Sequence, residues 1–279
     1  MTGSRALVRR PSPRLAEGLI THIDRSDHVD AELAQRQWEG YVAALRGAGW
    51  TTHEVPAAPE LPDSVFVEDT MVVYGDLAVI CRLGADERRR ETDAAQDAVR
   101  GQGFRIAAIE APGTLDGGDV LKHGGTAWVG VGGRTNAEGI AQLATHLQPF
   151  GVDVIGVPLT KALHLKSAVT ALPDGTIIGF EPVVDDPGVW GDRFLGVPEE
   201  PGSHVVLLDD DKLLMSSAAP HTAQLLERRG YRVVGVDISE FEKLEGCVTC
   251  LSVRLRGRPS VTGPRVPPTG RESSSDAPR

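Results

Sequence analysis

Cysteine is scarce in this sequence of 279 residues, which holds only three, an odd number. This argues against a disulfide-based scaffold, and we expect a reducing, cytoplasmic setting. The sequence lacks any apolar run near the ~20 residues that a membrane helix needs, and its first residues show no signal-peptide pattern. A basic excess is also missing, because 39 acidic residues against 29 Lys and Arg give a formal net charge of -10. We therefore expect neither a nucleic-acid nor a membrane partner, and a cationic small molecule suits the charge.

The sequence does contain a repeated pattern in which two apolar runs flank a turn signal. It predicts four hairpins, with turns at 75–76, 124–125, 173–175 and 209–211. Helical stretches follow three of them, at 87–100, 135–149 and 218–229. The third hairpin leads instead into a segment rich in Pro, Asp and Gly, at 181–203, for which no element is predicted.

Further elements surround these hairpins. A strand is expected at 6–10 and a helix at 30–48, with Asp30 as its N-cap and glycines ending it. Single strands are expected in the segments RIAAIE, VDVIGVPL and RVVGVDI, each after one of the helical stretches.

Two architectures fit this order of elements. Hairpins begin near residues 70, 119, 167 and 204, with another extended run from 247, which suggests a closed array of similar units around an axis. An α/β sandwich in which hairpins occur by chance is the alternative, and the pattern alone favours it. The Pro-, Ser- and Arg-rich residues 258–279 are predicted to be a disordered tail, which leaves 1–257 as a single domain.

Cys247 and Cys250 form a CxxC motif near the end of that domain. A zinc site would need a second pair of ligands, and only Cys81 is left. A redox pair should open a helix, whereas this segment is β-rich. Because residues three apart in a strand point to opposite faces, we expect at most one of the two thiols to face a given cleft. Inert buried thiols are the plain alternative.

Other polar residues suggest a site for a cation. Carboxylates cluster around an aromatic ring in DSVFVED (63–69), and GTLDGGD (113–119) holds two more beside a glycine pair. A histidine, His164, follows a predicted strand, and Arg82 and Arg134 follow others. Each has a structural alternative: a solvated loop, a tight turn, a buried histidine or surface arginines.

Taken together and in order, five motifs resemble those of the dimethylarginine dimethylaminohydrolases of the pentein superfamily. They are FVED (66–69), LDGGDV (115–120), RTN (134–136), LHLKS (163–167) and TCLSV (249–253). The resemblance runs from about residue 6 to 256. It implies an α/β fold, a five-bladed αβα propeller built from ββαβ units, in place of the sandwich.

The resemblance also implies an activity and its residues. The enzyme would be a cysteine hydrolase that converts Nω-methylated arginine to citrulline and (di)methylamine through a covalent thiouronium. Cys250 would be the nucleophile, His164 the general acid and base, and Asp116 the residue that orients the histidine. Asp69 would hold the guanidinium; Asp63, Phe66 and Glu68 would shape the pocket, Arg82 and Arg134 would bind the α-carboxylate, and Leu19 and Glu245 match lid and substrate-contacting positions. No metal or cofactor is implied, and a homodimer is left open.

The chemistry of these roles is coherent. A guanidinium carbon is a poor electrophile, and a thiolate is the side chain nucleophilic enough to attack it. Nearby carboxylates should raise the thiol pKa, so we expect the substrate cation to favour the thiolate. Four alternatives stay open: an arginine deiminase, another pentein hydrolase or amidinotransferase, a non-catalytic binder of cationic amino acids, and a CxxC redox or metal protein. The segment 202–214 departs from the family pattern, and Cys247 has no role in it.

Overall fold

Three-stranded sheets recur along the chain in the computed structural model, which describes residues 4–24 and 28–256. In that part of the chain there are five such sheets, and each joins one antiparallel to one parallel strand pair. The sheets are β15-β1-β2 (Val253–Leu255, Arg5–Val8, Thr51–Glu54), β3-β4-β5 (Met71–Tyr74, Leu77–Ile80, Arg105–Ala108), β6-β7-β8 (Val120–His123, Thr126–Val131, Asp153–Pro158), β9-β10-β11 (Val169–Ala171, Ile177–Gly179, Phe194–Gly196) and β12-β13-β14 (Val205–Leu207, Lys212–Ser216, Arg232–Val236).

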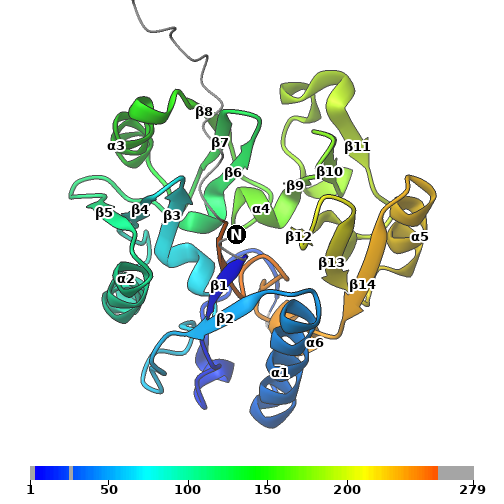
Figure 1. The fold of residues 1–279 in the computed structure, drawn as a ribbon, viewed down its shortest axis with the longest axis horizontal. Coiled ribbons are helices and arrows are strands. Elements are labelled where there is room, and N and C mark those ends of the chain that lie inside the picture. Colours follow the sequence, from blue (N-terminus) through cyan, green and yellow to red (C-terminus); the bar gives the residue numbers. More distant parts are fainter. Residues whose placement is uncertain (1–3, 25–27, 257–279) are drawn as a thin grey trace, which may run out of the picture.

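These sheets surround the middle of the molecule like the blades of a propeller, with the long helices outside them (Figure 1). The four predicted hairpins are confirmed as the first two strands of four blades. The remaining blade is closed by the two ends of the domain, since β1 pairs with β15 in antiparallel and with β2 in parallel. The five-bladed propeller is therefore confirmed, and the sandwich is wrong.

Helices occupy the crossover before the outer strand in four blades: α1 (Ala31–Gly47), α2 (Thr92–Gly101), α3 (Ala137–Leu147) and α5 (Pro220–Arg228). Asp30 caps α1 as predicted, and its side chain accepts hydrogen bonds from the N–H groups of Glu32 and Leu33. The blade that begins with β9 has only 3-10 turns in its crossover, which explains why 181–203 gave no helical pattern.

Short elements complete the chain. They are α4 (Leu165–Ala168), α6 (Ser239–Glu242) and the 3-10 helices η1 (Leu15–Glu17), η2 (Val67–Thr70), η3 (Asp86–Glu91), η4 (Gly117–Asp119), η5 (Gln148–Phe150), η6 (Glu181–Val183), η7 (Pro187–Val189), η8 (Gly191–Arg193) and η9 (Glu200–Ser203). The predicted helix over 87–100 is thus a 3-10 helix followed by an α-helix, and this break positions a side chain of the site below.

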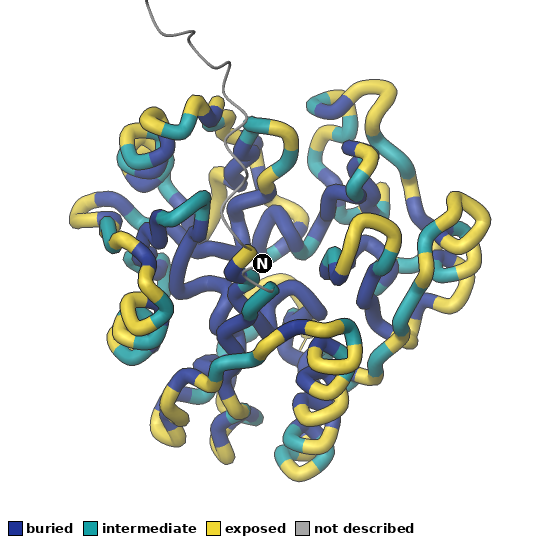
Figure 2. Tube along the Cα trace, in the orientation of Figure 1, coloured by how far each residue is buried: buried dark blue, intermediate teal, exposed yellow. Residues whose placement is uncertain are grey.

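The hydrophobic core is divided among neighbouring blades. One cluster, for example, joins apolar residues of β4, β7 and α3, including Val79, Val129 and Leu143. The inner strands are buried and the outer helix faces are exposed (Figure 2), because each blade buries its face only against its neighbours. Among the described helices, none has the length and apolarity to cross a bilayer. The predicted tail, 258–279, lies outside the described residues.

Candidate active site

A narrow cavity lies where loops from several blades meet. It is lined by Leu19, Asp63, Phe66, Asp69, Arg88, Arg134, Leu163, His164, Leu244, Glu245, Gly246 and Cys250. Most of the site residues predicted from the sequence are in this set. The exceptions are Asp116, which lies behind the histidine, and Glu68 and Arg82, which are discussed below.

The imidazole of His164 lies between two carboxylates. Its Nε2 is 3.1 Å from Oδ2 of Asp116, and its Nδ1 is 3.7 Å from Oδ1 of Asp69. Burial lowers the pKa of His164, but the carboxylates of Asp69, Asp116 and Asp119 outweigh it and raise the pKa to about 9. The ring therefore holds a proton near neutral pH that it can donate to a bound molecule.

Asp116 fixes the orientation of this ring. It is fully buried at the start of η4, and its other oxygen, Oδ1, accepts a 2.8 Å hydrogen bond from the N–H of Gly84. Burial alone would raise the pKa of Asp116, yet its hydrogen bond to His164 holds that pKa below its ordinary value. The carboxylate thus stays ionised and holds the imidazole in one position.

Asp69, at the end of the FVED motif, is held from two sides. Its Oδ1 accepts a hydrogen bond from the N–H of Gly118 at 3.0 Å, and its Oδ2 pairs with Nη1 of Arg88 at 2.9 Å. A Cβ atom at Gly118 would lie 2.6 Å from both Asp69 Oδ1 and His164 Nδ1. Glycine is therefore required there, because these two side chains occupy the space where a Cβ would be.

Asp119 is a supporting residue for which no role was predicted. It accepts hydrogen bonds from the N–H of Leu165 at 3.0 Å and from the hydroxyl of Thr135 at 2.6 Å. Burial raises the pKa of Asp119 to about 7. Asp119 is the second aspartate of the LDGGD motif, so the motif itself pointed to this residue. In the structure it links the loop that carries Asp116 to Leu165, the residue after His164.

The segment around Cys250 differs from its predicted form. Residues 247–251 form a turn, closed by a hydrogen bond from the N–H of Cys250 to the carbonyl of Cys247, and the strand starts only at Val253. The turn brings the sulfur atoms of Cys247 and Cys250 to 3.2 Å. The prediction that the thiols point to opposite faces is wrong, because it assumed an extended backbone. Cys250 lines the cavity, and its backbone carbonyl accepts a hydrogen bond from the N–H of Glu68.

The two thiols influence each other's ionisation. The hydrogen bond with Cys247 raises the pKa of Cys250, and burial and the carboxylates of Glu68 and Asp69 add to the rise. The same hydrogen bond lowers the pKa of Cys247 to about 5. In the protein alone the Cys247 thiol therefore ionises before the Cys250 thiol, and the expectation that a substrate cation favours the Cys250 thiolate stays a prediction.

Two arginines line the cavity, but Arg82 is not one of them. Arg82 donates to the carbonyl of Gly113 instead, outside the lining. Arg88, in η3, lines the cavity where Arg82 was expected. Its guanidinium makes a bidentate ion pair with Glu91. Arg134 lines the cavity as predicted, and its Nη1 is buried with no hydrogen-bond partner among the described residues. A buried donor of this kind suits an anionic group of a ligand.

Glu68 also lies elsewhere than predicted. Its carboxylate pairs with Lys166 at 2.6 Å and with Arg254, and it lines a second hollow on the other side of the chain. Successive residues of η2 thus face opposite ways. Glu68 separates the two hollows rather than shaping the pocket.

The outer wall of the cavity is tied together by carboxylates. Asp63 accepts from the N–H of Leu19, and Glu245 accepts from the N–H groups of Thr21 and His22 at 2.7 Å each. The N-terminal loop is thereby held against the residues that precede Cys250. This agrees with the positions expected for a lid and a contact residue.

Ligand atoms of Asp69, Asp116 and His164 lie within 4.8 Å of one another, near enough for a metal ion. These same atoms already serve the His164–Asp116 hydrogen bond and the Arg88–Asp69 ion pair. The three side chains thus already have hydrogen-bond or ion-pair partners within the protein.

Comparison with known proteins identifies the family. A family model described as arginine deiminase matches residues 47–193. An N(G),N(G)-dimethylarginine dimethylaminohydrolase of Streptomyces coelicolor is 58% identical over 256 residues, which cover 92% of this chain and 98% of that protein. The chain belongs to the dimethylarginine dimethylaminohydrolase family.

Solved structures agree with this family. The dimethylarginine dimethylaminohydrolase of Pseudomonas aeruginosa, a cysteine-to-serine variant complexed with citrulline, matches with 31% identity and a TM-score of 0.84, covering 91% of this chain and all of that one. A histidine-to-glycine variant of a dimethylarginine dimethylaminohydrolase, in an adduct with S-methyl-L-thiocitrulline, matches with the same identity and TM-score, over 90% and 99% of the two chains.

Proposed function

We propose that this member of the dimethylarginine dimethylaminohydrolase family is a cysteine hydrolase that converts Nω-methylated arginine to citrulline and methylamine or dimethylamine. One observation carries the proposal: His164, hydrogen-bonded to Asp116, lines one cavity together with Cys250 and with a carboxylate, Asp69. This set provides a nucleophile, a proton donor and a cation binder in one small space.

The ligands of the relatives support an amino-acid substrate. Citrulline is bound in the Pseudomonas structure, and S-methyl-L-thiocitrulline forms the adduct in the other. Both compounds combine an amino acid head with a planar group of the size of a guanidinium. The cavity offers carboxylates for a cationic group and the unpartnered Nη1 of Arg134 for a carboxylate.

The substrate would bind with its guanidinium on Asp69. In the structure one oxygen of that carboxylate pairs with the guanidinium of Arg88, which supports its assignment as a partner for a planar cation. The α-carboxylate would accept a hydrogen bond from the unpartnered Nη1 of Arg134. Arg88 is already paired with Asp69 and Glu91, so it would hold Asp69 in place rather than bind the α-carboxylate. Asp63, Phe66, Leu19 and Glu245 keep their predicted places around it.

In the first half of the reaction, the thiolate of Cys250 forms a bond to the guanidinium carbon. The bond from that carbon to the methylated nitrogen then breaks, and the departing amine takes the proton of His164. A thiouronium on Cys250 remains, and His164 is neutral.

In the second half, neutral His164 removes a proton from water, whose oxygen attacks the same carbon. The carbon–sulfur bond breaks and restores the thiolate, the new hydroxyl group gives its proton to the released amine or to solvent, and citrulline leaves. Asp116 holds the ring through both halves, because the same nitrogen must first give and then take a proton.

Arginine itself is the second candidate substrate, because the matching family model is described as arginine deiminase. The two activities share the cysteine chemistry and differ in the leaving amine. Turnover of arginine, monomethylarginine and dimethylarginine by the same preparation separates them. A clear preference for arginine would overturn the proposal as stated.

The decisive experiment is mass spectrometry of protein quenched during turnover of dimethylarginine. The expected adduct lies on the peptide that contains Cys250, and citrulline accumulates without added metal. Binding of dimethylarginine with no product would make the protein a non-catalytic binder of cationic amino acids. Stoichiometric zinc on Cys247 and Cys250 would instead favour a metal protein.

Two further features stay predictions. The described cysteines are free, which suits a reducing cytoplasmic compartment.

A homodimer would use exposed apolar side chains such as Val131 and Ile155 on the blade of β6–β8. Light scattering of the purified protein tests the dimer.

A further inference from the structure

A second hollow, the axial channel, runs along the middle of the propeller. Its volume is about 460 Å³, and it is lined by residues of β3, β6, β9, β12 and β15, the innermost strand of every blade. Glu68 and Thr249 line the channel, while their chain neighbours Asp69 and Cys250 line the active-site cavity. The channel and the cavity therefore lie back to back.

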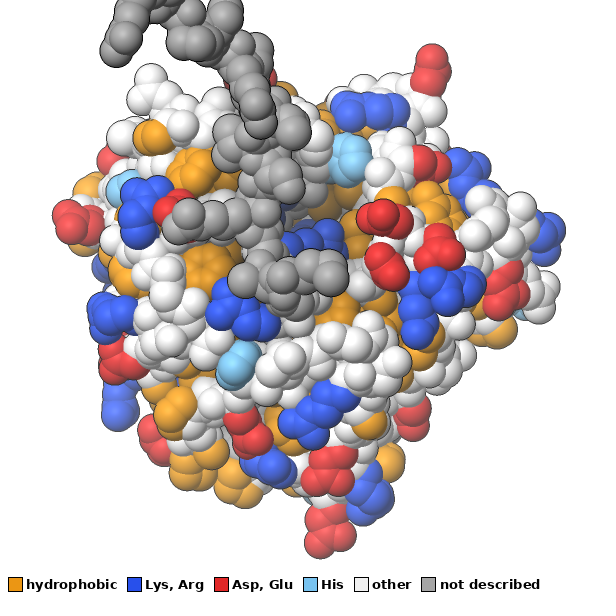
Figure 3. Space-filling model, in the orientation of Figure 1, with side chains coloured by type: hydrophobic (Ala, Val, Ile, Leu, Met, Phe, Trp, Pro, Cys, Tyr) orange, Lys and Arg blue, Asp and Glu red, His pale blue; other side chains and the backbone are white. Residues whose placement is uncertain are grey.

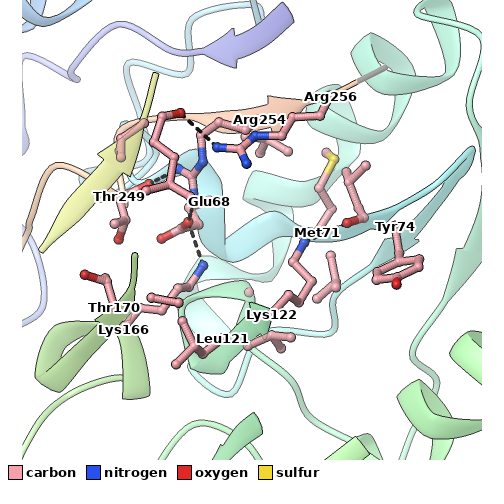
Figure 4. A pocket seen from close by; sticks show the side chains of 18 of the residues that line it. Glu68, Met71, Tyr74, Leu121, Lys122, Lys166, Thr170, Thr249, Arg254 and Arg256 are labelled. Atoms are coloured by element: carbon pink, nitrogen blue, oxygen red, sulfur yellow. Dashed lines mark hydrogen bonds and ion pairs between the residues drawn. The ribbon is translucent and has the colours of Figure 1, made fainter. Parts of the chain in front are cut away.

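The channel carries a strong positive charge. Four cationic side chains line it, from Lys122, Lys166, Arg254 and Arg256, against the single carboxylate of Glu68. Figure 4 shows these groups directed into one space, and Figure 3 shows basic side chains near the hollow in the middle of that face. This concentration occurs in a chain whose formal net charge is -10. The channel lining is therefore positive although the chain as a whole is negative.

Among residues 4–24 and 28–256, carboxylates neutralise only some of these cations. Glu68 accepts from Lys166 at 2.6 Å and also from Arg254. Lys122 donates to the carbonyl of Val73, at 2.6 Å, and Arg256 donates to the carbonyl of Leu207, at 2.8 Å. Within the described residues, neither Lys122 nor Arg256 has a carboxylate within ion-pair distance.

Lys122 is exposed to the solvent of the channel and lies near other cations. Desolvation and the positive charges of Lys166 and Arg254 lower the pKa of Lys122. An anion beside it would reverse this effect.

We propose that the axial channel binds a small oxyanion of the phosphate class, with two or more negative charges, through its four cationic side chains. The channel volume falls in the range of small-molecule sites, roughly 300–1,000 Å³. Guanidinium groups donate to such oxyanions in pairs, and ammonium groups neutralise them as point charges. The negative surface elsewhere disfavours longer polyanions.

The test is calorimetric titration with inorganic phosphate at pH 8, with chloride keeping the ionic strength constant. We expect saturable binding that weakens about tenfold in Lys122→Met and in Arg256→Gln, because each removes a charged hydrogen bond. The matched control is Arg232→Gln, which removes an exposed arginine paired with Asp211 on an outer strand. Its affinity for phosphate should equal that of the wild type.

Binding should also take up a proton at pH 8, measured by repeating the titration in two buffers of different ionisation enthalpy. Lys122 is the group that gains it, and the charged groups that act on it are Lys166, Arg254, Arg256 and Glu68, with Asp210 near Arg256. Lys122→Met should abolish the uptake.

Several outcomes would overturn the proposal. They are the absence of saturable heat, equal phosphate affinity in both channel variants and the wild type, or reproduction of the effect by chloride. A loss of binding in Arg134→Gln instead would place the anion in the active-site cavity. Circular dichroism checks folding, and Arg256→Gln decides the question where Lys122→Met does not fold.

Discussion

At the scale of single residues, the active-site cavity depends on buried charges that stabilise one another. His164, Asp116, Asp69 and Arg88 are all almost fully buried, and each has an oppositely charged neighbour. A substitution here changes the charge of the site as well as its shape. Predictions at this scale therefore pair each variant with a control of the same residue type.

The first prediction concerns the two thiols. Cys250→Ser should lower kcat by a factor on the order of 10⁴ or more, because the nucleophile is lost. Cys247→Ser should stay within about tenfold of the wild type, because Cys250 keeps its place in the cavity lining and a serine oxygen can still accept a hydrogen bond from its thiol. Release of citrulline is the measurement, and the opposite ranking would assign the nucleophile to Cys247.

The second prediction follows from the raised pKa of His164. A histidine pKa of about 9 in the folded state, against an ordinary value of about 6.5, adds stability that is fully present below pH ~6.5. This contribution, about 3 kcal/mol, should be lost as the pH rises to ~9.

Urea unfolding between pH 6 and 9.5 measures the effect. The wild type should lose more stability over this range than His164→Gln, whereas His221→Gln, which removes an exposed histidine, should follow the wild type. Parallel curves for wild type and His164→Gln would contradict the charged histidine.

The third prediction concerns Gly118. In Gly118→Ala the new methyl group would push Asp69 and His164 apart, and kcat/KM should fall roughly 100-fold, the effect of misplacing a catalytic group by about 1 Å. Gly133→Ala is the control, since no atom lies within 4 Å of a Cβ at that position. Equal activities would show that the close packing around Gly118 is not needed.

Most residues of the site could be predicted from motifs, but the two misplaced ones could not. Whether Arg82 or Arg88 reaches the cavity depends on η3, a 3-10 segment where the periodicity indicated a continuous helix. Likewise, the direction of Glu68 depends on the tight turn of η2. Such local backbone choices are settled by tertiary contacts and leave little trace in side-chain patterns.

At the scale of elements, hairpins could be predicted from the sequence where their turns require residues with a positive φ. Glycines with positive φ lie in three of the predicted hairpin turns, at 75, 124–125 and 175, so those hairpins could be predicted. The elements within 181–203 could not be predicted, because its 3-10 turns show no periodic apolar pattern. The segment 247–251 failed for another reason: β-branched and apolar residues there fill a buried turn rather than a strand.

The fourth prediction is an element-scale effect on α1. Asp30→Ala should lower the free energy of unfolding by about 1 kcal/mol, because two N–H groups lose their cap. Activity at 25 °C should be unchanged. Urea unfolding measures the change; Asp30→Asn, which keeps the acceptor, should restore most of the stability, and equal losses in both variants would point to charge rather than capping.

At the scale of the whole molecule, no single segment of the sequence determines the number of blades. Each blade is completed by its neighbours, and the first blade needs strands from both ends of the domain. The sequence pattern alone therefore favoured a sandwich, which is wrong. Only the resemblance across the full chain predicted the closed ring.

The fifth prediction tests that closure. A chain ending after Arg256 should fold and turn over substrate like the full chain, in agreement with the predicted tail. A chain ending after Ser252 lacks β15 and should melt at a much lower temperature, because β1 loses its antiparallel partner. Circular dichroism and citrulline release compare the two, and similar melting curves would show that β15 is dispensable.

The position of Cys250, three residues before β15, has a consequence for synthesis. A growing polypeptide carries the histidine, the carboxylates and the arginines of the site long before the ribosome adds its sulfur. The nucleophile and the strand that locks the ring are delivered together, in the last part of the folded domain. The proposed nucleophile therefore enters the fold together with the strand that pairs with β1 and closes the first blade.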